Sequence, residues 1–313
     1  MKIGELDVSK IYLESAEIEK IYLGTSQVYG GSEPTPTPYD EQYLTIESTS
    51  DNNTISLVTT YTGITRTVSA STDNGVTWTE YTSSTGGTQI ASLNAGQKVL
   101  LKGENSQYST ANTTYNYFTS IGQFNVYGNI MSLISGDSFE NADTLTGACA
   151  LNKLFSQCSG LTSAENFILP ATTLIHDCYK GMFQDCTSLT SAPSLPATTL
   201  ANYCYQAMFR NCTSLTTAPV LSATTLVKFC YQTMFYGCRS LNYIKCLATD
   251  ISASNCTMNW VNSVASTGTF VKAASMNDWT TDNNGIPNNW TVQNDDGSQS
   301  VDNPGGDNWD DQE

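Results

Sequence analysis

The chain has 313 residues, 13% of them charged, and a formal net charge of −16. Its 13 Lys and Arg against 29 Asp and Glu argue against nucleic acid as a partner, because phosphate binding needs clustered basic side chains. No apolar run approaches the roughly 20 residues that cross a bilayer, and the N-terminus lacks the apolar core of a secretory signal. We therefore expect a soluble chain, made without export and not inserted in a membrane.

Residues 1–30 contain an internal repeat that predicts short strands. Lys10-Ile-Tyr-Leu13 and Lys20-Ile-Tyr-Leu23 have the same sequence, and Val28-Tyr29 follows. The alternation fits two or three strands, but an isolated hairpin is only marginally stable in water. The segment should therefore dock by β-pairing on another surface, or else form an edge strand of the next domain. The residues predicted to dock are Ile11, Tyr12, Leu13, Ile21, Tyr22 and Leu23.

A linker and a β-domain are predicted next. Residues 31–41 are rich in Pro and Thr, as an extended spacer would be. Residues 42–135 contain alternating apolar and polar runs, such as 54–58, 65–69, 99–102 and 123–127, separated by turn residues. We interpret this part as a β-sandwich of immunoglobulin-like size.

One motif in this domain points to a turn. Ser71-x-Asp73-x-Gly75-x-Thr77-Trp78 resembles the Asp-box of sialidases, which in those proteins is a hairpin turn away from the chemistry. A sialidase would also need an arginine cluster to hold a carboxylate, and this domain contains only Arg66. We interpret the motif as structural.

A 26-residue repeat fills the C-terminal half. Cys-Tyr-x-x-Met-Phe-x-x-Cys begins at Cys178, Cys204 and Cys230, with Ala-Thr-Thr-Leu before each copy and Ser-Leu after it. The apolar positions have helical spacing and the Thr-rich, Pro-containing stretch that follows favours extended chain. Since one such repeat cannot bury its apolar face alone, neighbouring repeats should stack. The fold class predicted is thus multidomain and β-rich: an N-terminal β-hairpin segment, an immunoglobulin-like β-sandwich, and an α/β leucine-rich-repeat solenoid with a C-terminal cap over residues 136–292.

The ten cysteines are explained by this repeat. They recur on the predicted buried face, where Cys acts as a small hydrophobic residue. Paired CxxC or Cys/His clusters of zinc sites are missing from the sequence. Cysteines within one repeat stand eight residues apart, about 12 Å along a helix, too far to bridge. Buried free thiols are expected; disulfides between adjacent repeats and a metal site remain the alternatives.

The repeat also carries a family resemblance. LPATTLxxxCYxxMFxxCTSLTxAP is similar to the BspA-like leucine-rich repeats of gut Bacteroidetes and their phages, over about residues 139–292. Residues 124–133 resemble the junction that follows the β-module commonly found before such repeats. Residues 1–30 resemble the particle-binding pieces of phage structural proteins. The resemblance implies adhesion or binding of proteins and glycans.

Catalysis is not expected. His176 is the single histidine, and internal alignment places it in the slot of Asn202 and Lys228, as for a solvated position. Nucleophile elbows, phosphate loops and dinucleotide fingerprints do not occur in the sequence. Residues 293–313 form an acidic tail, predicted to be disordered, whose aspartates lack EF-hand spacing, although weak calcium binding stays open. We predict no enzyme activity, cofactor or metal site.

The resemblance predicts a bacteriophage virion structural protein, a head or tail fibre on the virion surface. Residues 1–30 would dock to capsid or tail proteins, the repeats would bind host-surface or mucin glycans or proteins, and by analogy with fibres the chain would be a homo-oligomer such as a trimer. A bacterial cell-surface adhesin is the alternative, and a surface glycan hydrolase is a third. The receptor-facing candidates, for which an ordinary solvated face is the competing interpretation, are His176, Asp177, Asn202, Tyr203, Arg210, Lys228, Phe229 and Tyr236.

Overall fold

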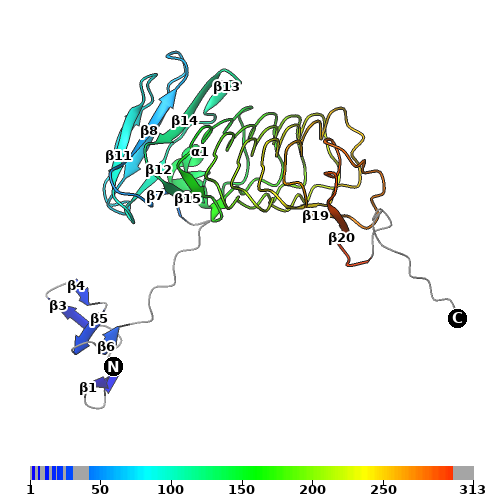
Figure 1. The fold of residues 1–313 in the computed structure, drawn as a ribbon. Helices are drawn as coiled ribbons and strands as arrows, with labels where there is room; N and C mark the ends of the chain where they lie inside the picture. Colours follow the sequence, from blue (N-terminus) through cyan, green and yellow to red (C-terminus); the bar gives the residue numbers. More distant parts are fainter. Residues whose placement is uncertain are drawn as a thin grey trace. The chain divides into compact units, whose positions relative to one another are not determined.

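The chain divides into a first unit, residues 1–38, and a second unit, residues 39–313. A computed structural model describes residues 2–3, 6–7, 11–13, 16–18, 20–23, 26–30 and 42–298 (Figure 1). Each unit is described by itself.

The described part of the first unit consists of strands in antiparallel pairs. The pairs are β1 (Lys2–Ile3) with β2 (Leu6–Asp7), β3 (Ile11–Leu13) with β4 (Ala16–Ile18), and β5 (Lys20–Leu23) with β6 (Ser26–Gly30). Residues 1–30 do contain short strands, but six are described where two or three were predicted. The predicted docking residues lie on β3 and β5, but the contacts of their side chains fall outside the described part of the chain, so docking stays a prediction.

The second unit begins with two antiparallel-rich sheets that share a core. One has the order β10-β9-β12-β7-β15-β16, with β17 also paired to β15, and the other has the order β11-β8-β14-β13. Inward residues such as Ile46, Leu57, Val99 and Phe118 are fully buried, because alternate residues of a strand point to opposite faces. The bounds are β7 (Leu44–Ser48), β8 (Asn53–Thr59), β9 (Thr67–Ser71), β10 (Thr79–Thr82), β11 (Thr88–Leu93), β12 (Lys98–Lys102), β13 (Ser109–Ala111), β14 (Thr114–Ser120) and β15 (Phe124–Asn129).

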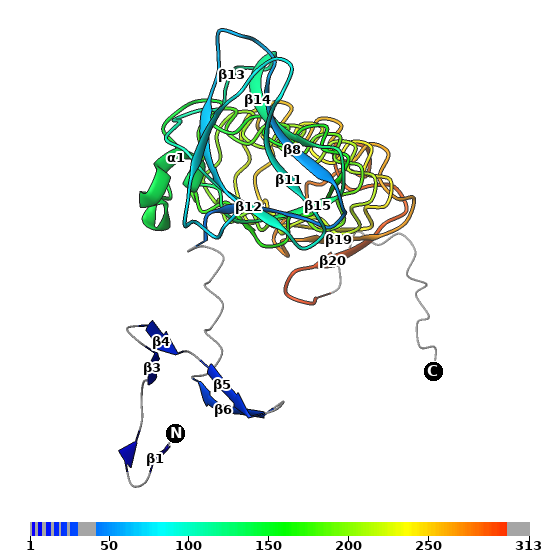
Figure 2. The ribbon, with the colours of Figure 1, turned by 90° about the vertical axis from the view of Figure 1, so that its left-hand side faces the viewer.

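The β-domain leads directly into a stack of coils. After β15 come a short helix α1 (Ser132–Ser135) and a 3-10 helix η2 (Gly136–Asn141), and β15 then pairs in parallel with β16 (Leu161–Ser163) and β17 (Phe167–Ile168) of the first coil. Figure 2 shows β8, β11, β12 and β14 in front of the coils. One cluster of buried residues runs from Leu44 to Val292, so both parts share a core. The boundary predicted at residue 135 stays a prediction.

The repeats consist of turns. Five ten-residue segments, 148–157, 176–185, 202–211, 228–237 and 254–263, have turn geometry, and we call them the turn segments. In the first four, alternate N–H groups donate within the coil, as Lys180 does to the carbonyl of Asp177 (3.3 Å), while the others donate to the next coil, as Phe183 does to Met208 (2.9 Å). The last coils add a parallel sheet of β18 (Tyr243–Cys246), β19 (Thr269–Lys272) and β20 (Thr291–Asn294).

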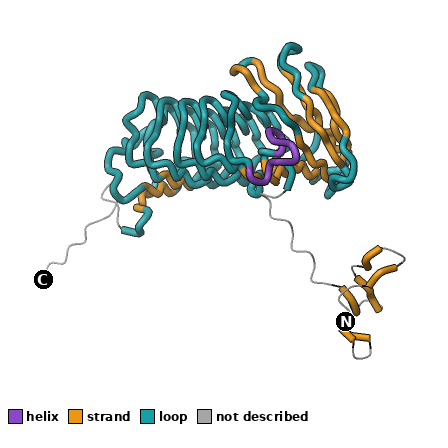
Figure 3. The backbone as a smooth tube through the Cα atoms, turned by 180° about the vertical axis from the view of Figure 1, so that it is seen from behind, coloured by secondary structure: helices purple, strands orange, loops and turns teal. Residues whose placement is uncertain are grey.

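The predicted α/β leucine-rich-repeat solenoid is therefore wrong, although the β-rich part of the expectation is right. The described repeats contain no helix, and none of the sheets found there forms a solenoid; Figure 3 draws the coils almost entirely as loop. Every fourth residue of a turn segment has a positive φ, for example Tyr203 (62°), Ala207 (55°) and Asn211 (61°), which no right-handed helix allows. Apolar positions repeat every four residues in a turn segment and every 3.6 residues in an α-helix. Over nine residues the two patterns drift apart by less than one residue. The spacing alone could not separate the two.

The positions predicted to be buried are buried all the same. All ten cysteines lie in the interior, and Tyr179, Met182 and Phe183 with their counterparts in the next coils are fully or almost fully buried. Equivalent rings stack from coil to coil: the centroids of Phe155 and Phe183 are 5.9 Å apart, and those of Phe183 and Phe209 are 5.6 Å apart. No helix in the described part of the chain has the length and apolarity to cross a bilayer.

Candidate binding surface on the repeats

The outward side chains of the five turn segments form a surface that we call the turn face. It carries four basic residues, Lys153, Lys180, Arg210 and Lys228, and two acidic residues, Asp177 and Asp185, for a local net charge of +2. The whole chain has a net charge of −16. The turn face is therefore a locally positive surface on an acidic protein.

The first column of the turn face contains most of the predicted receptor-facing residues. The ring of Tyr203 stacks on that of Phe229, with centroids 4.7 Å apart and an interplanar angle of 13°, and the His176 ring lies 5.3 Å from Tyr203. Lys180 Nζ lies over the Tyr203 ring at 5.1 Å, and Lys228 Nζ lies over the Phe229 ring at 5.2 Å. Since neighbouring groups cover the ring faces, this column offers a ligand its edges and charges instead of flat aromatic surfaces.

Asn202 and Lys228 occupy the same position of adjacent coils, at the border of this column. Both are exposed, and the Asn202 carbonyl accepts the N–H of Asp177 from the preceding coil (3.2 Å). The coils thus bring His176, Asn202, Tyr203, Lys228 and Phe229 into one line.

A second column brings Arg210 and Tyr236 together. The guanidinium carbon of Arg210 lies 5.0 Å from the centre of the Tyr236 ring, one coil away. Beside them, Asn211 Nδ2 donates to Asp185 Oδ1 (2.7 Å), which occupies one oxygen of that carboxylate. Cation–π contact orients Arg210; its Nε is buried without a partner, and its Nη groups make no hydrogen bond within the described residues.

A polar cluster centred on the buried Asp177 carboxylate lies where the first two coils meet. The Asp177 carboxylate is 2.8 Å from His176 Nδ1 and 3.3 Å from Lys180 Nζ, and the Cys149 thiol approaches Asp177 Oδ2 at 3.9 Å. Burial and then the charge of Asp177 raise the pKa of the Cys149 thiol. A nucleophilic cysteine needs a lowered pKa, so the environment of Cys149 opposes catalysis.

Burial disfavours the thiolate form of the other interior cysteines as well. Burial raises the pKa of Cys158, Cys178 and Cys238 from 9.0 to about 12. Four Sγ atoms donate to carbonyl oxygens that lie between 2.9 and 3.1 Å away on the preceding layer: Cys158 to Phe118, Cys186 to Phe155, Cys212 to Phe183 and Cys238 to Phe209. Among the described residues no three His, Cys, Asp or Glu side chains are grouped to hold a metal ion.

Sequence reasoning missed four polar partners in this surface. Lys153, Lys180, Asp185 and Asn211 were not among the predicted residues, yet they hold the aromatic columns or set the local charge. Lys153 Nζ donates to the carbonyl of Asn112 (3.0 Å) and lies 4.6 Å from the centre of the Tyr115 ring. The usable signal was the 26-residue offset, because residues 26 apart, such as 185 and 211, face each other on adjacent coils.

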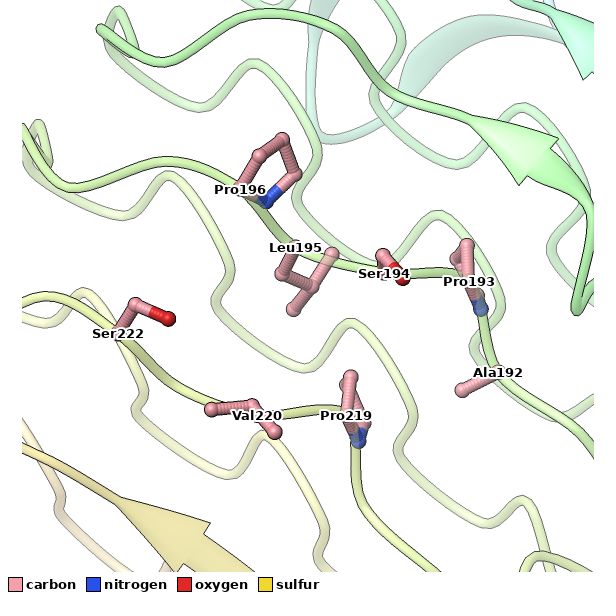
Figure 4. Close-up of a pocket in the computed structure, with 8 residues that line it drawn as sticks. All are labelled: Ala192, Pro193, Ser194, Leu195, Pro196, Pro219, Val220 and Ser222. Atoms are coloured by element: carbon pink, nitrogen blue, oxygen red, sulfur yellow. The ribbon is translucent and has the colours of Figure 1, made fainter.

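The extended sides of the coils carry an apolar groove of about 260 Å³. Figure 4 shows Ala192–Pro196 on one coil alongside Pro219, Val220 and Ser222 on the next. Within the described chain, no backbone hydrogen bond joins residues 190–200 to residues 216–226. The prolines are one cause, because they lack an N–H donor. We call this unpaired boundary the open seam.

The Asp-box-like motif forms a self-contained turn. Asp73 accepts hydrogen bonds from the Thr77 N–H (2.9 Å), the Thr77 hydroxyl (2.6 Å) and the Ser71 hydroxyl (2.7 Å). These bonds, those of Thr77 first, lower the pKa of Asp73 to about 2. The indole of Trp78 donates back to the carbonyl of Gly75 (3.0 Å). The carboxylate is therefore engaged in its own turn, as the structural interpretation expects.

The linker, residues 31–41, and residues 299–313 of the acidic tail lie outside the described residues, so predictions about them stay predictions. Residues 293 and 294, which the prediction placed in the tail, belong to β20. Comparisons with protein-family models, curated proteins and solved structures found no match to this chain.

Proposed function

We propose that this chain is a non-enzymatic attachment protein of a bacteriophage particle, whose turn face binds an anionic polymer on the host surface or in mucus. The observation that carries the proposal is the +2 charge of the turn face within a chain of net charge −16. An anionic partner is repelled by the rest of the chain and attracted to this one surface, which orients it on approach.

The repetition of the turn face favours a polymer over a small molecule. Adjacent paired segments lie about 4.8 Å apart, so the columns present equivalent positions at a regular short interval. The donors of Arg210 and the ammonium of Lys228 stand on neighbouring coils, and their stacked aromatic partners limit the side-chain freedom that binding would remove. Recognition would be ionic, since the faces of Tyr203 are already covered.

The particle assignment is supported by the resemblance of residues 1–30 to particle-binding segments and by the spacer after them. An oligomer held by these segments would multiply weak contacts of the turn face by avidity. Deletion of residues 1–30 should abolish incorporation into particles, as detected with antibodies against residues 42–298. Normal incorporation of the shortened chain would contradict docking through this segment.

Binding is tested with polygalacturonate and its fully methyl-esterified form, in which the same backbone carries neutral methyl esters in place of carboxylates. We expect the acidic polymer to bind, with affinity falling as salt rises, and Lys228→Gln and Arg210→Gln each to weaken binding about five- to tenfold. Lys245→Gln is the matched control, a partly exposed lysine on β18 away from the turn face. Equal binding of the esterified polymer, or unchanged binding by both variants, would refute the ionic recognition proposed.

A further inference from the structure

A second polar site lies in the β-domain, far from the turn face in sequence. A pocket of about 410 Å³ has a floor formed by strands and walls formed by two loops. Such a volume is within the range of small-molecule sites, about 300 to 1,000 Å³. Its lining consists of Thr67, Ser69, Glu80, Lys102, Gly103, Glu104, Asn105, Gly136 and Asp137.

The floor is a row of polar side chains across three adjacent strands. Ser69 on β9 is paired with Glu80 on β10 and with Lys102 on β12. Residues paired across neighbouring strands share one face of a sheet, and Thr67 shares that face because it lies two residues from Ser69. These side chains therefore start from fixed positions on a rigid sheet.

The walls are held by hydrogen bonds to backbone carbonyls. The N–H of Gly136 donates to the carbonyl of Gly103 (2.8 Å), and Asn105 Nδ2 donates to the carbonyl of Thr67 (2.8 Å). Gly136 has a φ of 54°, and a Cβ there would lie 3.2 Å from Glu104 Oε1. Glycine at this position therefore leaves room for the Glu104 carboxylate beside it.

One side of the pocket is a closed network. Lys102 Nζ is 2.7 Å from Asp137 Oδ1 and 4.3 Å from the centre of the Trp78 ring, and the Tyr43 hydroxyl donates to the same carboxylate oxygen (2.7 Å). The bonds from Lys102 and Tyr43 lower the pKa of Asp137, while burial and Asp137 raise the pKa of Tyr43 to about 12. The charge of Lys102 is thus largely compensated inside the pocket.

The opposite acids remain free. Within the described residues the side-chain carboxylate of neither Glu80 nor Glu104 makes a hydrogen bond or ion pair. Three acidic side chains and one lysine give the lining a net charge of −2, alongside two hydroxyls and one amide. This mixture of donors and acceptors matches a ligand rich in hydroxyl groups, because each hydroxyl both donates and accepts, and carboxylates accept especially strong bonds from them.

We infer that this pocket binds a neutral or amino-substituted saccharide of one or two residues. The negative lining excludes saccharides with carboxylate or sulfate groups, which is the opposite of the charge preference proposed for the turn face. The two sites would therefore select different sugars, and this inference does not depend on the turn face.

The test uses Trp78 as a reporter, since Lys102 lies on its ring. Three disaccharides serve as probes: one of glucosamine, its N-acetylated form and one containing glucuronate. We expect the tryptophan emission of the full chain to change with the first two, the amino form binding more tightly, and not with the third. Trp78→Phe should remove the response while calorimetry still detects binding.

Variants complete the test. Glu104→Gln and Glu80→Gln keep the shape of the pocket, and each should weaken the amino disaccharide about tenfold. Glu165→Gln, an exposed acid on the first coil, is the control and should bind as the wild type does. The inference is overturned if none of the saccharides binds, if the glucuronate form binds equally well, if both pocket variants bind normally, or if a lysine-rich peptide binds where the saccharides fail. Loss of binding in these variants with normal binding of polygalacturonate separates this site from the turn face.

Discussion

The thiol of Cys212 donates a hydrogen bond to the carbonyl oxygen of Phe183, 3.1 Å away on the preceding coil. The same bond occurs from Cys158, Cys186 and Cys238, so one sulfur connects each layer to the one before it. Phe183 O also accepts the N–H of Cys186 (3.1 Å), so the thiol bond is its second. Cysteine therefore combines the volume of a small apolar residue with a weak donor at a buried carbonyl.

Replacement of this cysteine should have a modest cost. Cys212→Ala removes the weak bond and part of a filled volume but leaves no carbonyl unsatisfied, so we expect a loss of about 1 kcal/mol in the free energy of unfolding. Cys186→Ala and Cys238→Ala should cost the same within error, as measured by thermal or denaturant unfolding. Ser240→Ala, at an exposed position, is the control. A loss confined to Cys212→Ala would show that the four bonds are not equivalent.

The interior thiols should resist modification. A pKa raised from 9.0 to about 12 lowers the thiolate fraction of Cys158 at pH 8 by roughly 1,000-fold, and burial blocks the reagent as well. A disulfide-exchange reagent should therefore label the native chain slowly and all ten cysteines quickly in denaturant. Fewer than ten thiols in fresh denatured protein would instead indicate disulfides between adjacent coils, the alternative that the sequence left open.

The same shifts predict that the fold weakens in alkali. Above pH 9.0 the thiols of the unfolded chain lose their protons, while those of the folded chain keep them until about pH 12. The unfolded state then binds fewer protons, so stability is complete below pH 9 and falls as the pH rises toward 12, by at most about 1.4 kcal/mol per unit for each thiol. Denaturant midpoints between pH 8 and pH 11 measure the slope, and a flat profile would contradict burial of the thiols.

Backbone strain in the turn segments gives a stabilising substitution. Thr233 has a φ of 52°, a conformation that β-branched residues rarely adopt, and Gly181 occupies the equivalent position two coils earlier. Thr233→Gly or Thr233→Asn should raise the free energy of unfolding by about 1 kcal/mol. Gly181→Ala should lower the free energy of unfolding by a similar amount, because alanine is strained at a positive φ. No larger loss is expected, since a Cβ there would meet only movable side-chain atoms of Gln184 and Lys153. A stabilising Gly181→Ala would mean that the φ inferred for this position is wrong.

The open seam should appear in hydrogen exchange. The amides of Ala192, Ser194 and Val220 have no acceptor across this boundary, whereas Ala218 and Leu221 donate to Tyr243 (2.9 Å) and Lys245 (3.0 Å) on the next coil. We expect the first group to exchange much faster than the second under native conditions. Equal protection of both groups would imply that the seam is closed in solution.

The sequence predicted which residues are buried better than it predicted the backbone conformation of the repeats. The cysteine, tyrosine and phenylalanine positions of each repeat are interior because their period matches the stacking, but turn and helix place side chains at nearly the same short spacing. Only the backbone angles of residues such as Tyr203 and Ala207 separate them. The predicted strands at 54–58 and 99–102 correspond to β8 and β12; burial alternates along β12 and along the first part of β8.

Both candidate sites depend on partners that are distant in the sequence. The alignment of the first column could be predicted from the repeat, because equivalent positions must align when coils stack. The pocket in the β-domain did not, because it joins residues 67–80, 102–105 and 136–137 through strand pairing that no local pattern encodes. Charge compensation, such as that between Lys102 and Asp137, is likewise visible only once the chain is folded.

Equivalent residues of neighbouring repeats contact each other, so the number of repeats can change without new contacts being needed between them. Residues 178–203 and 204–229 present the same cysteine, tyrosine and phenylalanine contacts at both of their boundaries, so excision of residues 204–229 would join two surfaces that already fit. Duplication of the unit would likewise move the C-terminal end outward by one layer, about 4.8 Å, while the β-domain at the other end stayed the same. Reach could thus be gained or lost in whole steps by the loss or duplication of similar repeats.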